Sequence, residues 1–144
     1  MKKIVLLCAS AAASMIVSTA AFAANGSTSQ GVEIQAGPGS EYPDVMRLAP
    51  NLKITIHACT RAWDWCDIEW RGNRGWAPAA ALDYRLDDTL LPVSDFGPRV
   101  GLPQVEFNLT KYWDANYRQR PWYSQRQEWV ERGPTKVLAE ATID

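Results

Sequence analysis

Apolar and polar residues alternate between residues 32 and 84 in a way that predicts a run of short β-strands. Val32 and Ile34 alternate with polar neighbours, and Ile54 and Ile56 do the same further along the chain. Segments rich in Gly, Pro and Asn separate these stretches. The predicted strands begin at Val32, Val45, Lys53, Trp65 and Arg74, with a hairpin turn at Gly72-Asn73. Short strands at this spacing indicate a mainly β fold, a small β-barrel rather than a helical domain.

The segments that follow and precede the predicted strands have a different composition. Residues 24–31 are small and polar, which indicates a flexible lead-in. Residues 85–104 are punctuated by Pro and Gly and are interpreted as a connector. Residues 105–144 form a C-terminal extension, and alternating apolar residues at 105–109 predict that it begins with one more short strand.

The C-terminal extension is also predicted to contain one helix, over residues 121–132. Pro121 suits the first helical turn, where its missing amide hydrogen would have had no partner, and Gly133-Pro134 suits a helix end. The side chains expected on one side of this helix are Trp122, Arg126 and Trp129.

The first 23 residues have the three-part pattern of a secretory signal peptide. Lys2 and Lys3 precede an uncharged stretch, and Ala21-Phe22-Ala23 places small residues at positions −3 and −1 before Ala24. A membrane anchor is the alternative, but the apolar stretch is short and rich in Ala and Ser, whereas a spanning helix needs about 20 strongly apolar residues. We therefore expect cleavage after Ala23, a periplasmic or secreted mature chain and no stable membrane insertion after cleavage.

Several ordered motifs in the β region resemble those of bacterial SH3-like domains (SH3b, SH3 type 3). The opening of that family is similar to Val32-Glu33-Ile34-Gln35-Ala36-Gly37-Pro38-Gly39 followed by Tyr42-Pro43, although Glu33 and Gln35 stand where the family often has Asn and Arg. Its later strands resemble Trp65-Cys66-Asp67-Ile68 and Gly72-Asn73-Arg74-Gly75-Trp76-Ala77, and its closing turn resembles Ala80-Ala81-Leu82. The aromatic and Arg-rich C-terminal part resembles the tail of exported SH3-domain proteins of α-proteobacteria. The resemblance implies an SH3-like barrel over residues 32–84 whose loops dock peptides or pieces of the cell wall.

The net charge argues against a nucleic-acid partner. The chain has 15 Lys and Arg against 16 Asp and Glu, and removal of Lys2 and Lys3 with the leader leaves 13 bases against 16 acids. Nucleic-acid-binding domains usually carry an overall positive field, which this chain lacks.

Two cysteines, Cys59 and Cys66, remain after the leader is removed, and two predicted antiparallel strands bring them together. In an exported protein they most simply form one disulfide, which across about eight residues stabilises the fold by roughly 2.5 kcal/mol. The alternative is a zinc site made of His57, both cysteines and Asp64 or Asp67. The close-spaced Cys pairs of structural zinc sites are absent, so we expect a disulfide and neither a metal nor another cofactor.

Few residues could form a catalytic site. His57 is the only histidine, and as a general base it would need a nucleophile and an orienting partner. It lies on the strand face opposite Ile54 and Ile56, so an exposed strand histidine is the simpler interpretation. The carboxylate pair Asp87-Asp88 carries no mark of a glycosidase site. We therefore expect no enzymatic activity.

Aromatic residues are the unusual component, with seven Trp and five Tyr in the chain, and the four Trp and two Tyr of residues 32–84 exceed what the core of so small a barrel needs. Trp70 and Trp76 are interpreted as core residues. Tyr42, Trp63 and Trp65 are the candidate ligand-binding residues, because aromatic rings in loops stack on sugar rings and peptide planes. A core position remains the alternative for Trp63 and for Trp65, although Trp63 falls at a charged hairpin tip where burial is least expected.

The tail allows two interpretations. Residues 111–132 contain five bases and three acids among aromatic rings, whereas residues 31–84 contain five bases and seven acids. The tail could pack on its own barrel through aromatic and cation–π contacts, which the opposite local charges favour. It could instead form a partner or anion-binding surface from Arg118, Trp122, Arg126 and Trp129.

These observations lead to a functional expectation of non-enzymatic binding outside the cytoplasm. The first hypothesis is an exported SH3-like module that recognises a peptide or a cell-wall (peptidoglycan) component through an aromatic loop groove. The alternative is an envelope protein–protein adaptor or structural factor that docks a partner through the aromatic C-terminal helix.

Overall fold

The chain forms a mainly β fold, as the alternating pattern predicts. The structure is a computed structural model that describes residues 23–141, and the side chains among them up to residue 133. Within this range eight strands form one antiparallel sheet in the order β3-β2-β6-β5-β4-β1-β7-β8. The strands are β1 (Ala24–Thr28), β2 (Val32–Gln35), β3 (Asp44–Leu48), β4 (Lys53–Cys59), β5 (Trp65–Trp70), β6 (Asn73–Pro78), β7 (Leu82–Leu86) and β8 (Thr89–Pro92).

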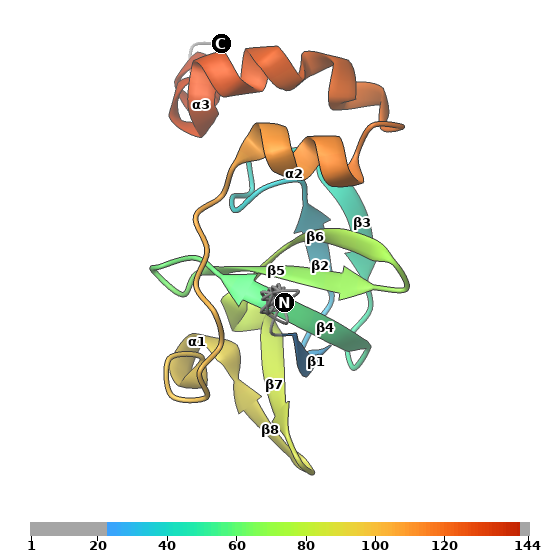
Figure 1. Ribbon diagram of the computed structural model, residues 1–144, viewed down its shortest axis with the longest axis vertical. Coiled ribbons are helices and arrows are strands. Elements are labelled where there is room, and N and C mark those ends of the chain that lie inside the picture. Colours follow the sequence, from blue (N-terminus) through green and yellow to red (C-terminus); the bar gives the residue numbers. More distant parts are fainter. Residues whose placement is uncertain (1–22, 142–144) are drawn as a thin grey trace, which may run out of the picture.

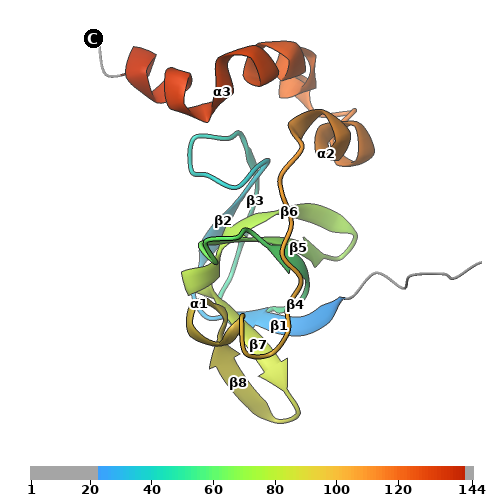
Figure 2. The ribbon, with the colours of Figure 1, turned by 60° about the vertical axis from the view of Figure 1, so that its left-hand side comes forward.

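Short helical segments lie at both ends of the sheet. In chain order they are η1 (Ala79–Ala81), α1 (Val93–Phe96), α2 (Leu109–Asn116), η2 (Pro121–Gln125) and α3 (Arg126–Ala141). Figures 1 and 2 show α2 and α3 together at one end of the molecule, next to the loop that joins β2 and β3. The hairpin of β7 and β8 projects from the opposite end, with α1 beside it.

The five strands predicted between residues 32 and 84 are all present, and β2 and β5 have the bounds expected from the sequence. The predicted turn at Gly72-Asn73 lies one residue earlier, because Trp70 pairs with Asn73 and leaves Arg71 and Gly72 as the central residues. Both have positive φ, 48° for Arg71 and 79° for Gly72. Such a two-residue turn matches the twist of the strands, and glycine adopts positive φ without strain.

The predicted flexible lead-in is wrong over Ala24–Thr28, which forms strand β1 between β4 and β7. The small residues of this segment permit a close approach of backbones. A Cβ atom on Gly26 would lie 2.7 Å from the carbonyl oxygen of Asp83 and 2.7 Å from Cδ1 of Ile56. The composition that suggests flexibility is therefore what allows this strand to fit.

The strand predicted at residues 105–109 is also wrong. The chain makes one parallel bridge, between Gln104 and Cys59, and α2 then begins at Leu109. Asn108 caps this helix, since its side-chain oxygen accepts a hydrogen bond of 2.9 Å from the amide of Lys111. Asn is among the preferred N-cap residues, and here the cap determines the structure instead of the short alternation.

The helix predicted over residues 121–132 is confirmed as a helical segment but not in its details. Its first five residues form the 3₁₀ helix η2, and α3 continues to Ala141. Gly133 has φ 64° and kinks α3 at the position predicted to end it. Residues 85–104, which were interpreted as a connector, also contain regular structure, namely β8 and α1.

Apolar side chains on one face of the strands form the hydrophobic core. Ile34, Ile56 and Ile68 are completely buried, and Trp76 is a core residue as predicted. Trp70, also predicted in the core, is half-buried at the β5–β6 turn, where the guanidinium of Arg71 lies 4.7 Å from its ring centre.

The predicted disulfide between Cys59 and Cys66 is confirmed, with a sulfur–sulfur distance of 2.06 Å and both residues fully buried. The two cysteines face each other across β4 and β5. Cys59 also anchors the start of the C-terminal extension. Its amide donates to the carbonyl of Pro103, and its carbonyl accepts from the amide of Val105, both at 2.9 Å. The disulfide therefore stabilises the hairpin and the point where the extension joins the sheet.

Replacing Cys59 and Cys66 together by Ala is expected to lower the free energy of unfolding by roughly 2.5 kcal/mol, because the unfolded chain regains the freedom of a short loop. Urea denaturation of parent and variant measures this difference. A thiol-specific label should react with these two cysteines only after reduction. Labelling of both residues in the unreduced native protein would contradict the assignment.

Candidate ligand-binding surface

The side chain of Trp113 attaches the C-terminal extension to the sheet. Its ring is fully buried, and its indole Nε1 donates a hydrogen bond of 2.8 Å to the carbonyl of Ala36 in the β2–β3 loop. One turn later along α2, the hydroxyl of Tyr117 donates to the carbonyl of Arg74 at 2.9 Å. Burial raises the pKa of Tyr117 above its usual value. These contacts bind α2 to two separate parts of the sheet.

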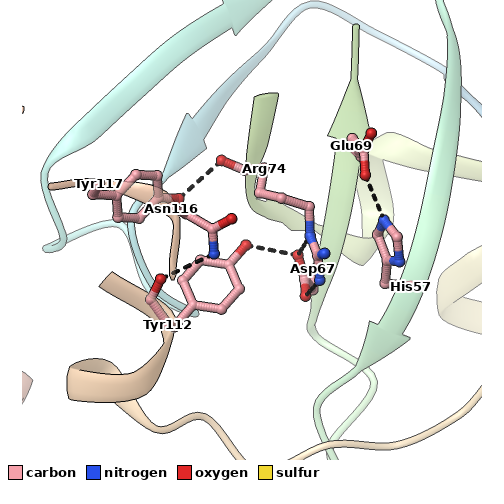
Figure 3. A network of polar contacts seen from close by, with 7 residues as sticks. All are labelled: His57, Asp67, Glu69, Arg74, Tyr112, Asn116 and Tyr117. Atoms are coloured by element: carbon pink, nitrogen blue, oxygen red, sulfur yellow. Dashed lines mark hydrogen bonds and ion pairs between the residues drawn. The ribbon is translucent and has the colours of Figure 1, made fainter. Parts of the chain in front are cut away.

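A polar network between the sheet and α2 is centred on Asp67, a buried carboxylate on β5 (Figure 3). Arg74 donates to it from Nε at 3.0 Å and from Nη2 at 2.5 Å, and the hydroxyl of Tyr112 donates to Oδ1 at 2.7 Å. Burial, followed by the negative charge of Asp67, raises the pKa of Tyr112 far above its usual value. The hydrogen bond to Asp67 raises the pKa of Arg74. The network is therefore a satisfied ion pair that joins the extension to the sheet.

His57 belongs to a separate pair in Figure 3, in which its Nε2 lies 3.0 Å from Oε2 of Glu69. The histidine is half-buried, so the exposed position predicted for it is wrong. Its partner Glu69 lies on the neighbouring strand β5. Among the described contacts no hydroxyl or thiol reaches His57, so this pair lacks the nucleophile that a triad requires.

Tyr42 is the predicted ligand-binding residue that the structure connects to the tail. Its ring lies directly on Gly37, where a Cβ atom would be 2.7 Å from the ring carbons. The ring stacks on Trp129 with centres 5.3 Å apart and meets Phe107 edge-on at 5.5 Å. Tyr42 is 7% exposed. Burial, with the nearby charge of Glu41, raises its pKa to about 12.

A groove of about 300 Å³ runs beside these three rings, between the β2–β3 loop, the start of α2 and α3. We call it the aromatic groove; its lining residues are Tyr42, Phe107, Asn108, Leu109, Thr110, Trp129, Val130 and Gly133. None of these residues is charged. A second groove of about 280 Å³ lies on the other side of Phe107 and Asn108, where Arg74, Glu106 and Lys111 supply charges. The two grooves share Phe107 and Asn108, so they form a surface with an uncharged half and a half that carries charged side chains.

Trp63 and Trp65 lie elsewhere. Trp63 is half-buried at the tip of the β4–β5 hairpin, with φ 59°, and its ring lies against α1, where a Cβ atom on Gly97 would be 2.5 Å from Cε3. The expectation that burial is least at this charged tip is therefore wrong, because the connector covers it. Trp65 is half-buried and pairs with Pro78. Neither tryptophan belongs to the lining of the aromatic groove that contains Tyr42.

The predicted tail surface packs largely on the protein itself. Trp122 is half-buried, with its ring centre 4.7 Å from that of Trp113 and 5.0 Å from that of Tyr117. Trp129 stacks on Tyr42, and Arg126 forms an ion pair with Asp114. Arg118 alone of the four candidates remains largely exposed, with 66% of its side chain accessible. Of the two interpretations of the tail, packing on the sheet is the one that these contacts support.

Sequence reasoning missed three residues that shape this surface: Phe107, Asn108 and Trp113. Asn108 carried a usable signal, because Asn is among the residues preferred at helix N-caps. Phe107 was assigned to a strand. Nothing in the local sequence distinguishes the buried Trp113 from the half-buried Trp122, because tertiary contacts decide which ring is enclosed.

Comparison with known proteins adds no further identification: no protein family, curated protein or solved structure matches this chain. Residues 23–141 contain no helix long and apolar enough to cross a membrane. The same residues contain no group of three or more His, Cys, Asp or Glu side chains that could hold a metal ion. The predicted signal peptide lies outside the described residues, apart from Ala23.

Replacing Arg74 by Leu is expected to lower the free energy of unfolding by about 3–5 kcal/mol, because the buried carboxylate of Asp67 loses its cationic partner. Tyr112→Phe removes one hydrogen bond to the same carboxylate and should cost about 1–3 kcal/mol. Arg47→Leu is the control, since it breaks an exposed ion pair with Glu33 and should change the stability by about 1 kcal/mol or less. Equal losses for Arg74→Leu and Arg47→Leu in urea denaturation would contradict the role of the network.

Alkaline pH is expected to destabilise the fold through its buried tyrosines. The pKa of Tyr42 rises from 10.0 to about 12 on folding, so the folded state favours the neutral phenol. Its contribution to stability is therefore complete below pH 10.0 and is lost as the pH rises through about 12. Denaturation curves recorded across this interval measure the loss, and Tyr42→Phe should reduce its slope. A stability that does not change with pH in this interval would show that the phenol is not buried.

Proposed function

We propose that this chain is an exported, non-enzymatic binding protein, in which an SH3-like β module and its C-terminal extension together recognise a peptide or a peptidoglycan component. The motif resemblance over residues 32–84 supports the assignment of the module, and so do five short antiparallel strands followed by the turn η1. The confirmed disulfide between Cys59 and Cys66 supports an oxidising compartment. The sheet begins at Ala24, directly after the proposed cleavage position, so removal of the leader would leave β1 intact.

The observation that carries the proposal is the aromatic groove. The half-buried rings of Phe107 and Trp129 supply ring surface and the buried ring of Tyr42 supports them, while Asn108 and Thr110 supply polar groups beside them. Rings of this kind stack on sugar faces and on peptide planes, and neighbouring amide or hydroxyl groups fix the orientation of the bound group. The groove is small and open to solvent, so the expected affinity is modest.

Docking of a partner protein through the tail receives less support from the packing. The ring of Trp122 is engaged with Trp113 and Tyr117, which leaves Trp129 as the tail ring that offers surface, and it does so inside the aromatic groove. Val130 is the apolar residue of α3 that remains well exposed among the described side chains, at 46%. One exposed aliphatic side chain offers little area for a stable protein interface.

Sedimentation with purified peptidoglycan, and capture on an array of immobilised peptides, test the proposal. Val130→Arg places a long charged side chain at the groove and is expected to raise the Kd about tenfold, a loss of about 1.4 kcal/mol. Gln127→Arg adds the same charge to an exposed position of α3 outside the groove and should bind like the parent.

Trp63→Ala and Trp65→Ala test the hairpin that the sequence favoured. Parent-like binding by both variants together with loss in Val130→Arg would assign recognition to the aromatic groove. Unchanged binding in Val130→Arg, or no retention of the parent by either probe, would overturn the proposal.

A further inference from the structure

Besides the two grooves described above, a polar cleft lies at the opposite end of α2 from the aromatic groove. It has a volume of about 420 Å³ and is polar; its lining residues are Asn73, Asp114, Ala115, Asn116, Arg118, Gln119 and Arg120. The groove involves the first residues of α2, whereas this cleft involves the last residues of the helix and the turn between β5 and β6. We call it the arginine cleft, and the inference that follows does not depend on the proposed function.

The two arginines of the cleft retain donors for a ligand. Arg118 donates from Nε to the carbonyl of Asp114 at 2.9 Å, which holds the base of its guanidinium while most of the side chain stays exposed. Arg120 donates from Nη1 to the carbonyl of Val45 at 3.2 Å. Each guanidinium carries five N–H donors, so both are positioned by the protein and still have donors left over.

The acidic residue of the cleft does not cancel this positive charge. Asp114 accepts a hydrogen bond of 2.7 Å from the hydroxyl of Tyr123 and forms an ion pair with Arg126, a third arginine outside the cleft lining. Its ion pair with Arg118 is longer, with Nη2 of Arg118 3.9 Å from Oδ2. Tyr123 and Arg126 compensate the carboxylate from the side of η2 and α3. The charged lining residues Asp114, Arg118 and Arg120 therefore leave a net charge of +1 in the cleft, on a chain whose overall charge is −1.

Amide side chains complete the lining. Asn73 uses its Nδ2 on the carbonyls of Trp70 and Arg71, and Asn116 uses its Nδ2 on the carbonyl of Tyr112. Their Oδ1 atoms therefore stay available as acceptors for hydroxyl or amide groups of a ligand. Gln119 is exposed at the edge of the cleft and adds a further donor and acceptor.

We propose that the arginine cleft binds a carboxylate or phosphate group carried by a polar molecule such as a sugar. The guanidinium groups of Arg118 and Arg120 would hold the oxyanion through charge-assisted hydrogen bonds. The amides of Asn73, Asn116 and Gln119 would bind hydroxyl groups of the carrier. A free anion would occupy a small part of the cleft, since a water molecule accounts for about 30 Å³ of liquid volume and an oxyanion for only a few times that.

Four probes test this inference: glucose, glucuronic acid, glucose 6-phosphate and inorganic phosphate. The first three share a sugar ring and differ in charge, and the fourth is the anion alone. Each is titrated into the isotope-labelled full chain while the backbone amide signals of residues 114–120 are followed by NMR. We expect both charged sugars to shift these signals, glucose to leave them unchanged, and inorganic phosphate to bind more weakly than glucose 6-phosphate. Arg118→Gln should weaken the binding of both charged sugars about tenfold, the value expected for loss of one charge-assisted contact.

Arg61→Gln is the control, because it removes an exposed arginine at the β4–β5 tip and should bind like the parent. Gln119→Ala should weaken the binding of the charged sugars and leave the binding of inorganic phosphate unchanged. The inference is overturned if none of the charged probes shifts these signals, if glucose shifts them equally, or if Arg118→Gln binds like the parent. Equal affinity for inorganic phosphate and glucose 6-phosphate would contradict the claim that the cleft also binds the sugar that carries the phosphate.

Discussion

The enclosure of Trp113 is the interaction on which the architecture of this protein depends. Its ring is fully buried and its indole nitrogen satisfies the carbonyl of Ala36, so α2 is fixed against the β2–β3 loop. A helix of eight residues has little stability on its own in water, so this packing explains why α2 exists. The rings of Tyr117 and Trp122 then pack around Trp113 and position the rest of the extension.

Both proposed binding surfaces follow from this attachment. The aromatic groove exists because α3 carries Trp129 onto the ring of Tyr42, and the arginine cleft exists because the end of α2 lies beside the β5–β6 turn. Neither surface belongs to the β module or to the extension alone. The extension is thus part of the folded unit, and its excess of aromatic residues serves first to join it to the sheet and second to line a groove.

The sequence predicts the strands well because alternation over β2 to β6 is a local property, and the disulfide of Cys59 with Cys66 follows from the pairing of the two strands that carry these residues. It fails where contacts between distant segments decide the structure. The small residues around Gly26 fit between two strands only in the context of Ile56, which no local pattern reveals. Likewise, Tyr42 packs against Phe107 and Trp129, which are more than sixty residues away in the sequence, so no local pattern indicates these partners.

Native-state hydrogen exchange is the most direct test of the claim that Trp113 makes the extension part of the fold. The amides of Tyr112 and Tyr117, which donate to the carbonyls of Asn108 and Trp113, report on α2, and those of β4 report on the sheet. The account predicts that the α2 amides are protected with an opening free energy close to that of the sheet and that Trp113→Ala abolishes this protection. Exchange of these amides at the rate of an unfolded peptide in the parent protein would contradict it.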